Sequence, residues 1–588
     1  MILSSCASIL VHHLSKVEVR RAKLTSVSRF LLASLHMQSL KDKISVRKVK
    51  EALTQLPRGS GSAASKIAYD ETMNRIRGQE KGFCDLAIAT LSWISLAMRP
   101  LRLRELQCAL SVEPGDTAMD EANFIDEETL SSACAGLIVV DDESQIVRLA
   151  HYTTQEYFES QKDVLFRDKQ NLFATTCLTY LSFDVFSNWQ LKKGSYTWYS
   201  QPLSSVAAPN DKEPYSLCYP LIRYAASHWH EHAHSSQGPT IQGQVIKYLK
   251  RTENLAALLC PGGWYQYEED VRDLLFSQGV HGLPIAARYG FTDAVKALLD
   301  LEGYCAEDRS RIKARALSLA ALSEQSSAVR ILLDGNTIAP AAVSRALKFI
   351  CSRYHYKAKP GVAEILLNHG ADPNIRHDDT DTPLIHLASR ENDVQFADLL
   401  LSHGADVELR DEESRTALHL AAKKGHSGDI VKVLLENKLD INARDDKGQT
   451  AMLTAVRYFS PWEPEKYRSL ITQLLECGAS VNESNIHGWT ALHWAAAHGV
   501  VEIACQLLEA GADINARDRN GDTAAGWLVS KGWNWDSITE EERAECEEIL
   551  ERYSFYQSGE RISAYDSDED ANDIDEVAYD SDKVADLC

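Results

Sequence analysis

The stretch that decides the fold is "TALHLAAKKGHSGDIVKVLLENKLDINARDDKGQ", residues 416–449. Its opening phrase returns as "TPLIHLASREN" at Thr382, "TAMLTAVRYFS" at Thr450, "TALHWAAAHGV" at Thr490 and "TAAGWLVSKGW" at Thr523. Successive starts are 34, 34, 40 and 33 residues apart. A recurrence of this length predicts a solenoid in which each unit buries its apolar face against its neighbours.

Every repeat also contains a second apolar phrase, seen as "EILLNHGADPN", "DLLLSHGADVE", "VLLENKLDIN", "QLLECGASVN" and "QLLEAGADIN". The leucine pairs have helical spacing and should face the neighbouring helix. Four of the phrases place a glycine where a helix C-terminus favours a left-handed residue: Gly370, Gly404, Gly478 and Gly511. The 40-residue step contains "SPWEPEKY", whose prolines predict a loop.

Weaker copies of the pattern begin upstream at His281, Arg315 and Arg345, and they keep the small-residue core without the threonine. Motif, period and second phrase together resemble the ankyrin repeat, with its T-P-L-H-x-A signature. The resemblance implies eight repeats over residues 268–535, forming one curved α-solenoid. It also implies that His419 and His493, each with a threonine three residues before it, satisfy backbone groups between repeats and are not catalytic.

The joints between repeats should follow D-x-x-G-x-T, as "DDKGQT", "SNIHGWT" and "DRNGDT" do. Thr380 and Ser414 take the glycine position in the two remaining joints. A left-handed backbone costs a residue with a side chain roughly 1–2 kcal/mol. We therefore expect looser turns at these two joints.

The region 81–160 predicts a winged helix. Two apolar-periodic helices are separated at Pro100, a short helix follows in "DEETLSSACAGL", and "GLIVVDDESQIVRLAH" alternates like a β-hairpin. Thr153 and Glu156 have the spacing of a capping box at the start of another helix.

Collinear blocks between residues 28 and 235 resemble fungal NACHT–ankyrin proteins, which are NOD-like signal-transducing NTPases of the STAND class. These blocks are "FLLASLHMQSLKDK", "ALTQLPRGS", "AYDETMNRI", "LSWISLAMRPLRLRELQCALSV", "CAGLIVVDDESQIVRLAHYTTQEYF" and "YPLIRYAASHWHEHA". The resemblance implies a mostly α protein with six successive parts. They are a helical segment remaining after a missing NACHT domain (1–78), a winged-helix-like domain (79–165), a helical connector (166–260), ankyrin repeats (268–535), a C-terminal capping helix (536–560) and a disordered acidic tail (561–588).

The nucleotide-binding domain of that family has no counterpart here. No G-x-x-x-x-G-K-[ST] motif occurs, and the glycine-rich "GSGSAASK" at 59–66 lacks the Gly-Lys-Ser/Thr order. We interpret that stretch as a linker, so nucleotide hydrolysis is not carried over. The chain thus resembles the C-terminal portion of such a protein.

The segment His230-Glu231-His232-Ala233-His234 matches the H-E-x-x-H pattern of zinc proteases. A zinc site needs a third ligand, and Glu253 stands alone without a second motif. The family pattern, Tyr-Ala-Ala followed by Trp and His, selects His232 instead, which is not one of the two zinc-spaced histidines. A zinc hydrolase therefore remains a remote alternative.

Charge is unevenly distributed in this chain of net charge −22. Residues 1–60 hold eleven Lys or Arg and three Asp or Glu, whereas residues 540–588 hold eighteen Asp or Glu and four Lys or Arg. The expected recognition helix and wing of the winged helix are acidic, which argues against binding of nucleic acid. The acidic tail should be disordered, Ser567 has the setting of a phosphorylation site, and the tail could fold back on the basic 1–60 segment.

The 13 cysteines include no C-x-x-C pair, which argues against a disulfide framework or a zinc ribbon and favours a reducing intracellular compartment, cytoplasmic rather than nuclear. No apolar run is long enough to span a membrane.

The sequence predicts a non-enzymatic interaction scaffold with a regulatory or signalling role, without cofactor or metal. The alternative is the C-terminal part of a NOD-like NTPase whose P-loop domain is missing. A protein partner, possessing a basic patch, should bind the concave face and the hairpin tips. The predicted contact residues are Asp378, Asp379, Asp411, Glu412, Glu413, Asp445, Asp446, His487, Trp489, Trp494 and Arg519. Trp494 has an equally plausible interpretation as core filling between helices.

Overall fold

The computed structural model describes residues 62–167, 169–187, 219–236, 238–259, 281–300, 304–335, 338–350, 360–377, 381–460, 462–530, 544 and 548–550. The chain divides into two compact units. The first comprises residues 1–286 with 296–300, and the second comprises 287–295 with 301–588.

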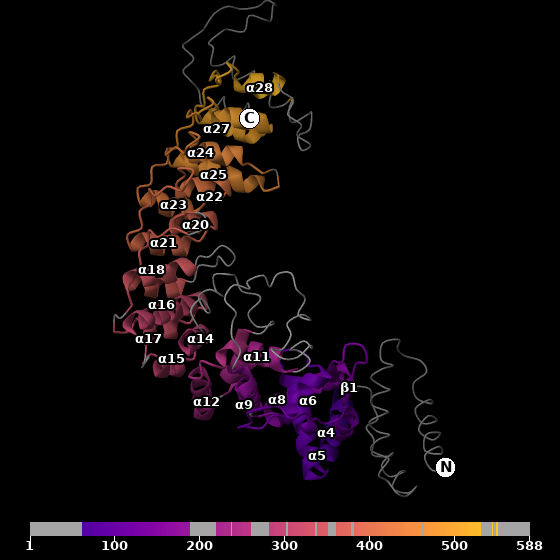
Figure 1. The fold of residues 1–588 in the computed structure, drawn as a ribbon. Helices are drawn as coiled ribbons and strands as arrows, with labels where there is room; N and C mark the ends of the chain where they lie inside the picture. The colour runs from indigo at the N-terminus through magenta and orange to yellow at the C-terminus, as the bar shows by residue number, and fades with distance from the viewer. Residues whose placement is uncertain are drawn as a thin grey trace, which may run out of the picture. The chain divides into compact units, whose positions relative to one another are not determined.

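The first unit begins with the predicted winged helix (Figure 1). Helices α4 (Ser62–Arg77), α5 (Lys81–Leu96), α6 (Leu103–Ser111) and α7 (Glu127–Ala133) precede strands β1 (Ile138–Val140) and β2 (Val147–Leu149), and a 3-10 turn, η1, spans Glu121–Asn123. The strands pair antiparallel with Val139 opposite Arg148. An isolated antiparallel bridge also joins Arg102 to Ile146, outside the two strands. Helices α5, α6 and α7, followed by this small sheet, confirm the predicted winged helix.

Helix α8 (Tyr152–Leu165) starts earlier than the capping-box spacing indicated. The N-cap residue is His151, whose side chain accepts a hydrogen bond from the backbone N–H of Thr153 at 3.2 Å. Thr153 is therefore inside the helix, and the predicted box between Thr153 and Glu156 is wrong. A histidine ring accepts this bond as a hydroxyl would, but it is a rare N-cap residue.

The connector shares its core with the winged helix. It consists of α9 (Lys169–Leu181), η2 (Asp184–Phe186), α11 (Ile222–Ser235), α12 (Pro239–Leu249) and η4 (Leu255–Leu259). The Trp93 ring of α5 stacks on Phe173 of α9 with centroids 3.9 Å apart and meets the edge of Tyr224 of α11. All three side chains are fully buried. Such aromatic burial stabilises both parts together, so they form one compact unit.

The second unit is a stack of helix pairs. Helices α14 (Gly282–Tyr289) and α15 (Thr292–Leu298) lie at the division between the units. The pairs that follow are α16 (Ala306–Leu322) with α17 (Ser326–Leu333), α18 (Pro340–Phe349) with α19 (Pro360–Asn368), α20 (Leu384–Arg390) with α21 (Val394–Ser402), α22 (Ala417–Lys423) with α23 (Asp429–Glu436), α24 (Ala451–Arg457) with α25 (Pro464–Glu476), and α26 (Ala491–His498) with α27 (Val501–Glu509). Helix α28 (Ala524–Ser530) is the last.

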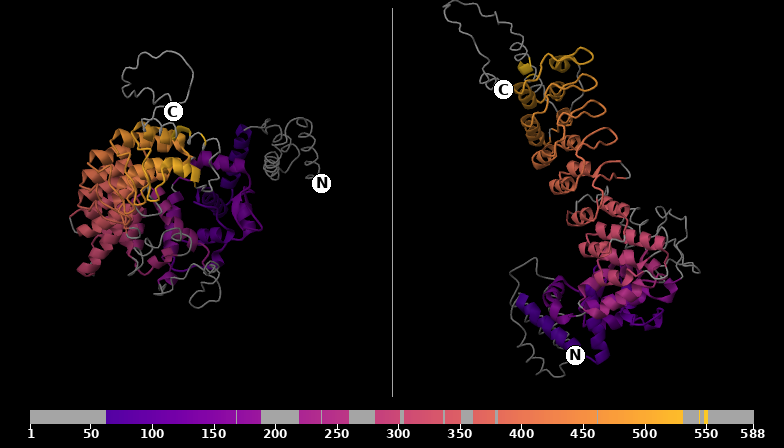
Figure 2. Two further views of the ribbon diagram at one scale, coloured as in Figure 1. Left: turned by 90° about the horizontal axis from the view of Figure 1, so that it is seen from above. Right: turned by 90° about the vertical axis from the view of Figure 1, so that its left-hand side faces the viewer.

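Equivalent helices of successive pairs pack against one another in two rows. The first helices α20, α22, α24, α26 and α28 form one continuous row, and the second helices α17, α19, α21 and α23 form another. The right-hand view of Figure 2 shows the loops that connect the pairs leaving the stack on one side. Small buried residues such as Ala421, Ala422, Ala495 and Ala496 let the first helices approach closely.

The predicted left-handed residues at the ends of the second helices are confirmed. Gly370, Gly404, Gly478 and Gly511 have φ values of 84°, 87°, 87° and 85°. Lys438 takes the same conformation, with a φ of 68°, in the phrase that lacks glycine.

The first hairpin is one residue longer than the one that follows it. His377 N–H bonds to Thr382 C=O, five residues on, whereas Asp411 N–H bonds to Arg415 C=O, four residues on. The N-cap of α20 is consequently Pro383, whereas the motif threonines Thr416, Thr450 and Thr490 are the N-caps of α22, α24 and α26. The left-handed residue of this hairpin is Asp381, with a φ of 42°. Thr380, which the sequence placed there, lies outside the described residues.

The six extra residues of the 40-residue step fall in the α24–α25 pair, where the sequence placed the insertion. Helix α25 has 13 residues where α23 has 8, and the connection before it, 458–463, is one residue longer than the connection 424–428 before α23. Pro464 is the first residue of α25, where proline needs no hydrogen-bond partner. Trp462 precedes it and is 92% exposed. The extra length is thus accommodated within one repeat, mainly at the start of its second helix.

Several predictions fall outside the described residues: the helical segment before residue 62, most of the capping helix, the acidic tail with Ser567, and Asp378 and Asp379. In the described part, no helix is long and apolar enough to cross a bilayer. Among the cysteines described, Cys84, Cys108, Cys134, Cys177, Cys305 and Cys477 are free thiols. Cys505 is disulfide-bonded, which the sequence did not indicate.

Candidate functional site

Four hairpins of the second unit, at residues 411–415, 445–449, 485–489 and 518–522, are each held by one buried or half-buried side chain at the base. The Asp411 carboxylate accepts hydrogen bonds from the backbone N–H groups of Glu413 (3.0 Å) and Arg415 (2.9 Å) and from the Arg415 guanidinium (2.8 Å). Asp445 accepts from two backbone N–H groups in the same way, at 2.9 and 2.7 Å. Asn485 and Asp518 take the same role in the next two hairpins. These side chains form the turns themselves.

The protonation of Asp411 reflects this role. Burial alone would raise the pKa of its carboxyl, but the hydrogen bonds and charge of Arg415 outweigh burial and hold the pKa below its ordinary value. The carboxylate is therefore ionised and already bonded within its own hairpin.

Arginines at the entry to the hairpins connect each hairpin to the next. Arg376 donates to the carbonyl oxygen of Arg410 at 2.8 Å, and Arg410 donates to that of Arg444 at 2.6 Å. Arg444 continues the series by donating to Ser484 and by pairing with Glu483 at 2.7 Å. We call Arg376, Arg410 and Arg444 the arginine ladder. The sequence carries its signal, a 34-residue recurrence, which the motif analysis did not use.

The hairpin tips are also joined directly by backbone hydrogen bonds. Asp446 N–H donates to Glu413 C=O at 3.1 Å, Ile486 N–H to Lys447 C=O at 3.0 Å, and Arg519 N–H to His487 C=O at 3.0 Å. Side chains on these tips are thus presented at fixed spacings, which lowers the entropy lost when a ligand binds.

The predicted contact residues fall into two classes. Glu412, Glu413, Asp446, His487 and Arg519 are exposed on the tips. Asp445 is half-buried, and Asp411, with 8% of its surface exposed, belongs to the base of its hairpin. The exposed charge changes along the stack, because the tips are acidic at Glu412, Glu413 and Asp446, whereas the last one carries Arg519.

Trp489 and Trp494 belong to an aromatic cluster that crosses several repeats. Trp489 lies 4.5 Å from Trp494 and 4.4 Å from Trp527, measured between ring centroids. The indole N–H of Trp527 donates to Asp518 at 3.0 Å, which fixes that end of the cluster. Trp489 and Trp494 are both half-buried, so they fill space between helices and still present part of their surface.

Cations continue this cluster along the first helices. The Arg457 guanidinium lies 5.2 Å from the Trp494 ring centroid and 5.5 Å from that of Tyr458, and the Lys423 ammonium lies 4.9 Å from Tyr458. These separations are within cation–π range. Lys423, Arg457 and Tyr458 were not among the residues predicted from the sequence, because residues 34 or more positions apart meet only when the repeats stack.

The recurring histidines have structural roles. His419 accepts a hydrogen bond from Thr416 N–H at Nδ1 (3.2 Å) and donates from Nε2 to Gln449 C=O (2.9 Å), which joins adjacent repeats as expected. His493 donates similarly to Asp522 C=O at 3.2 Å. His386 donates to Arg415 C=O at 2.7 Å, and burial lowers its pKa to about 4. These rings are neutral and bonded within the stack, and of the two nitrogens of His386 only Nε2 has a hydrogen-bond partner.

His232 of the "HEHAH" segment is a core residue. Its Nδ1 donates to the Gln170 side chain at 2.5 Å, and its Nε2 accepts from the Tyr224 hydroxyl at 2.7 Å. Burial lowers its pKa to about 4. The zinc-spaced His230 and His234 lie on the same helix, α11. In the described part of the chain, no group of three His, Cys, Asp or Glu side chains could hold a metal ion.

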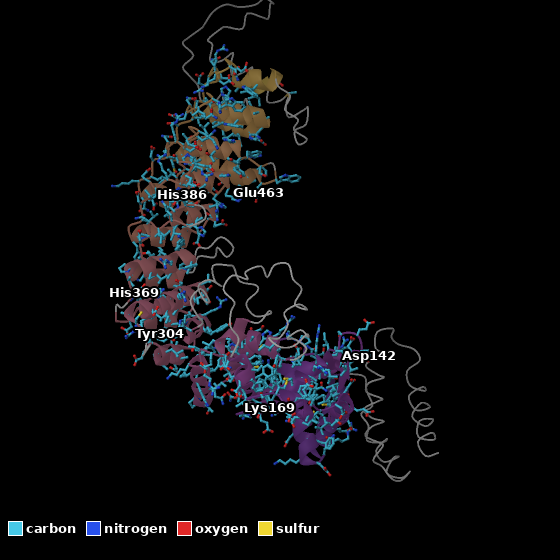
Figure 3. The ribbon with its side chains drawn as sticks, viewed as in Figure 1. Asp142, Lys169, Tyr304, His369, His386 and Glu463 are labelled. Carbon is cyan, nitrogen blue, oxygen red and sulfur yellow. The ribbon has the colours of Figure 1, made fainter. Side chains whose placement is uncertain are left out.

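The wing of the first unit has the acidic tip that the sequence indicated. Asp141 accepts hydrogen bonds from Ser144 N–H (2.9 Å) and Oγ (2.8 Å) and pairs with Arg148. Asp142 and Glu143 are exposed beside it, and Asp142 lies at the end of the β1–β2 hairpin (Figure 3). Exposed acids at this position would repel a phosphate backbone.

Comparison with protein families agrees with this geometry. Residues 350–445, 386–484, 428–518 and 464–532 each match the family model of ankyrin repeats in three copies. Residues 350–532 are ankyrin repeats. Residues 71–176 match the model of the GPI inositol-deacylase winged helix domain, so the first unit carries a winged helix. No curated protein matches the chain significantly.

The residues that match the ankyrin model include both the hairpins and the first helices. Its segments start at residue 350, whereas the helix pairs of the structure begin earlier, with α16 and α17. The candidate site is therefore the surface of the ankyrin repeats formed by the exposed tips and the first helices, together with the cation–aromatic cluster.

Proposed function

We propose that this chain is a non-enzymatic scaffold whose ankyrin repeats bind a protein partner. The supporting observation is the set of exposed side chains on hairpin tips that backbone hydrogen bonds hold together. A surface fixed before binding lowers the entropic cost of association. The side chains suited to acid–base chemistry in these repeats, Asp411, His386 and His419, are already bonded within the stack.

The contact set that we propose is Glu412, Glu413, Asp446, His487 and Arg519, with Trp489 and Trp494 beside it; the neighbouring Asp378 and Asp379 belong to the same set by sequence. Its acidic part suits a partner with a basic patch. We include Asp411 and Asp445 as residues that shape the hairpins. We propose an intracellular, regulatory or signalling role. We also propose that the chain does not bind nucleic acid, and the acidic wing supports this second point.

Site-specific photocrosslinking of the full chain in cells tests this function. A crosslinking amino acid is placed at Glu413 or His487 on the tips and, as a matched control, at Lys432 or Glu476 on the second helices. All four positions are on the ankyrin repeats, so folding is affected similarly. Crosslinks to a distinct protein from the tip positions alone support the proposal, and equal products from all four positions would contradict it.

A second candidate is that these residues form the C-terminal part of a NOD-like signal-transducing NTPase. The winged-helix match at residues 71–176 favours this candidate, since a winged helix followed by a connector and ankyrin repeats has the order of that family. Sequencing the transcript upstream of Met1 tests it. An in-frame segment encoding G-x-x-x-x-G-K-[ST] would support it, and a stop codon without such a segment would eliminate it.

A zinc hydrolase receives no support from the placement of His232 in the core. Metal analysis of the purified chain should give zinc far below one ion per molecule. A stoichiometric ion that is lost on replacing His230 and His234 would revive that alternative.

A further inference from the structure

One surface of the ankyrin repeats carries cations that the proposed tip contacts do not use. It comprises Lys423, Arg457, Tyr458 and Trp494, which cation–π contacts join, and we call it the cation–aromatic surface. The exposed Trp462 follows Tyr458 by four residues in the chain, and we include it. Lys423 ends α22 and Arg457 ends α24, one repeat further along. In the described part of the chain, neither cation has a carboxylate within ion-pair distance, and neither does the adjacent exposed Lys424.

Part of this arrangement serves the fold, because a cation near a helix C-terminus interacts favourably with the helix dipole. That role does not account for the aromatic residues. Trp462 is 92% exposed and Tyr458 is 40% exposed. Exposed aromatic rings beside unpaired cations are typical of a surface that binds a ligand carrying negative charge and flat groups.

The chain itself contains a segment with the complementary chemistry. Residues 562–588 hold ten Asp or Glu and one Lys, and they contain Ala-Tyr-Asp-Ser-Asp twice, at 564–568 and 578–582. Each copy places a tyrosine beside acidic residues. We propose that this acidic C-terminal segment binds the cation–aromatic surface of the same molecule, with tyrosines against the aromatic rings and carboxylates against Lys423 and Arg457.

The covalent connection is long enough for this contact. Leu550 is buried within the second unit, and 14 residues separate it from Tyr565. Fully extended, they span about 45 Å, and the 28 residues before Tyr579 span about 90 Å. Neighbouring helices pack about 8–10 Å apart, so the first-helix row from α20 to α28 measures roughly 40 Å. Both copies can therefore reach the surface, and the connection keeps their effective concentration high.

The bound segment would lie beside Trp489 and Trp494 and would compete with a partner for part of the site. Only this competition rests on the proposed function. Binding of the segment is a separate property, and it is measured without any partner.

The first experiment measures binding of a fluorescent peptide of residues 562–588 to the chain ended after Arg561, by anisotropy. Binding should weaken strongly between about 0.1 M and about 1 M salt, as the Debye length falls from about 10 Å to about 3 Å. The double variant Lys423→Gln/Arg457→Gln should weaken binding roughly tenfold. The matched control Arg330→Gln/Lys432→Gln removes one Arg and one Lys from second helices and should leave binding unchanged.

Trp462→Ala and a peptide with both tyrosines replaced by alanine separate aromatic contacts from charge. Each change should weaken binding several-fold, and Trp462 is exposed enough for its removal to leave folding intact. Equal affinity for the double variant and its control would overturn the proposal. So would binding that persists in the double variant and disappears when Arg20 and Arg21 are replaced, because the segment would then bind the basic 1–60 region.

A second experiment establishes that the contact is within one molecule. Zero-length coupling of carboxylates to amines is applied to a mixture of isotopically heavy and light full-length chains. Products that join residues 562–588 to Lys423 or Lys424 within a single isotope label support the proposal. Products with mixed labels would show that a second copy supplies the segment, which overturns the intramolecular contact. Partner crosslinks at Glu413 and His487 do not require this contact and should persist or increase when it is lost, so the two proposals fail independently.

Discussion

Replacing Ser414 with glycine should stabilise the hairpin between the α20–α21 and α22–α23 pairs. Ser414 has a φ of 57°, and its N–H donates to Asp411 C=O at 3.0 Å. The left-handed conformation costs a residue with a side chain roughly 1–2 kcal/mol. Glycine removes that strain but loses about 0.5–1 kcal/mol of additional backbone entropy on folding. The expected net gain in the free energy of unfolding is therefore about 0.5–1 kcal/mol.

The reciprocal change, Gly448→Ser, should destabilise the next hairpin. Gly448 has a φ of 67°, and a Cβ atom added there would lie 3.1 Å from the backbone nitrogen of Ile486. That nitrogen donates to Lys447 C=O at 3.0 Å, so the new side chain strains both its own backbone and the contact between hairpins. We expect a loss of about 2 kcal/mol. Ser469→Gly, in the interior of α25, is the control for Ser414→Gly, because it makes the same replacement inside a helix. It should lower the free energy of unfolding by up to about 1 kcal/mol.

Hydrogen exchange followed by mass spectrometry resolves the hairpins individually. Protection at residues 411–416 should rise in Ser414→Gly, and protection at 445–450 should fall in Gly448→Ser. In the unchanged chain, the Ser414 hairpin should exchange faster than those with glycine, as the sequence analysis predicted. Equal protection of all hairpins, or no gain in Ser414→Gly, would refute the assignment of strain to the left-handed serine.

Three further outcomes follow from the contacts described. Arg410→Ala removes bonds to two carbonyl oxygens and should lower the free energy of unfolding by about 1 kcal/mol, seen as faster exchange in two adjacent hairpins. Asp411→Ala should cost about 2 kcal/mol in urea unfolding, whereas Glu412→Ala should change it by less than about 0.5 kcal/mol. His232 has a folded pKa of about 4, below its unfolded value, so its contribution is complete above about pH 6.5 and declines as the pH falls toward 4. The melting temperature of the first unit should therefore fall between pH 7 and pH 5, and a rise would contradict the buried neutral ring.

The repeat architecture was predictable because each unit buries its apolar face with the same kinds of residue at the same positions. Small residues at 421 and 422, leucine pairs and terminal glycines recur at a fixed period, so a single copy with an altered residue does not hide the pattern. The residue at which an individual hairpin ends and the next helix begins is harder to predict. One additional residue before Thr382 moved the N-cap to Pro383, and the threonine motif alone could not show this.

The candidate site was predictable only as a set of positions. Sequence spacing places Asp411 and Glu412 together at a hairpin, but neighbouring residues there point in different directions, one into the turn and one to solvent. The cation–aromatic surface was not predictable, since Lys423, Tyr458 and Trp494 come from three repeats and become neighbours only through stacking. The arginine ladder is the intermediate case, visible as a recurrence but without an evident partner until the carbonyl oxygens are placed.

The position of the long insertion has a consequence for how the repeats could be modified. The six extra residues lengthen the α24–α25 connection by one residue and α25 itself by five, while the backbone bond from Ile486 to Lys447 still joins the hairpins on either side of that repeat. Length added within a helix pair therefore leaves the hairpin series intact, whereas length added to a hairpin shifts a helix cap. The connection near Trp462 is consequently a natural position for grafting a foreign loop or a fluorescent reporter without disturbing the tips.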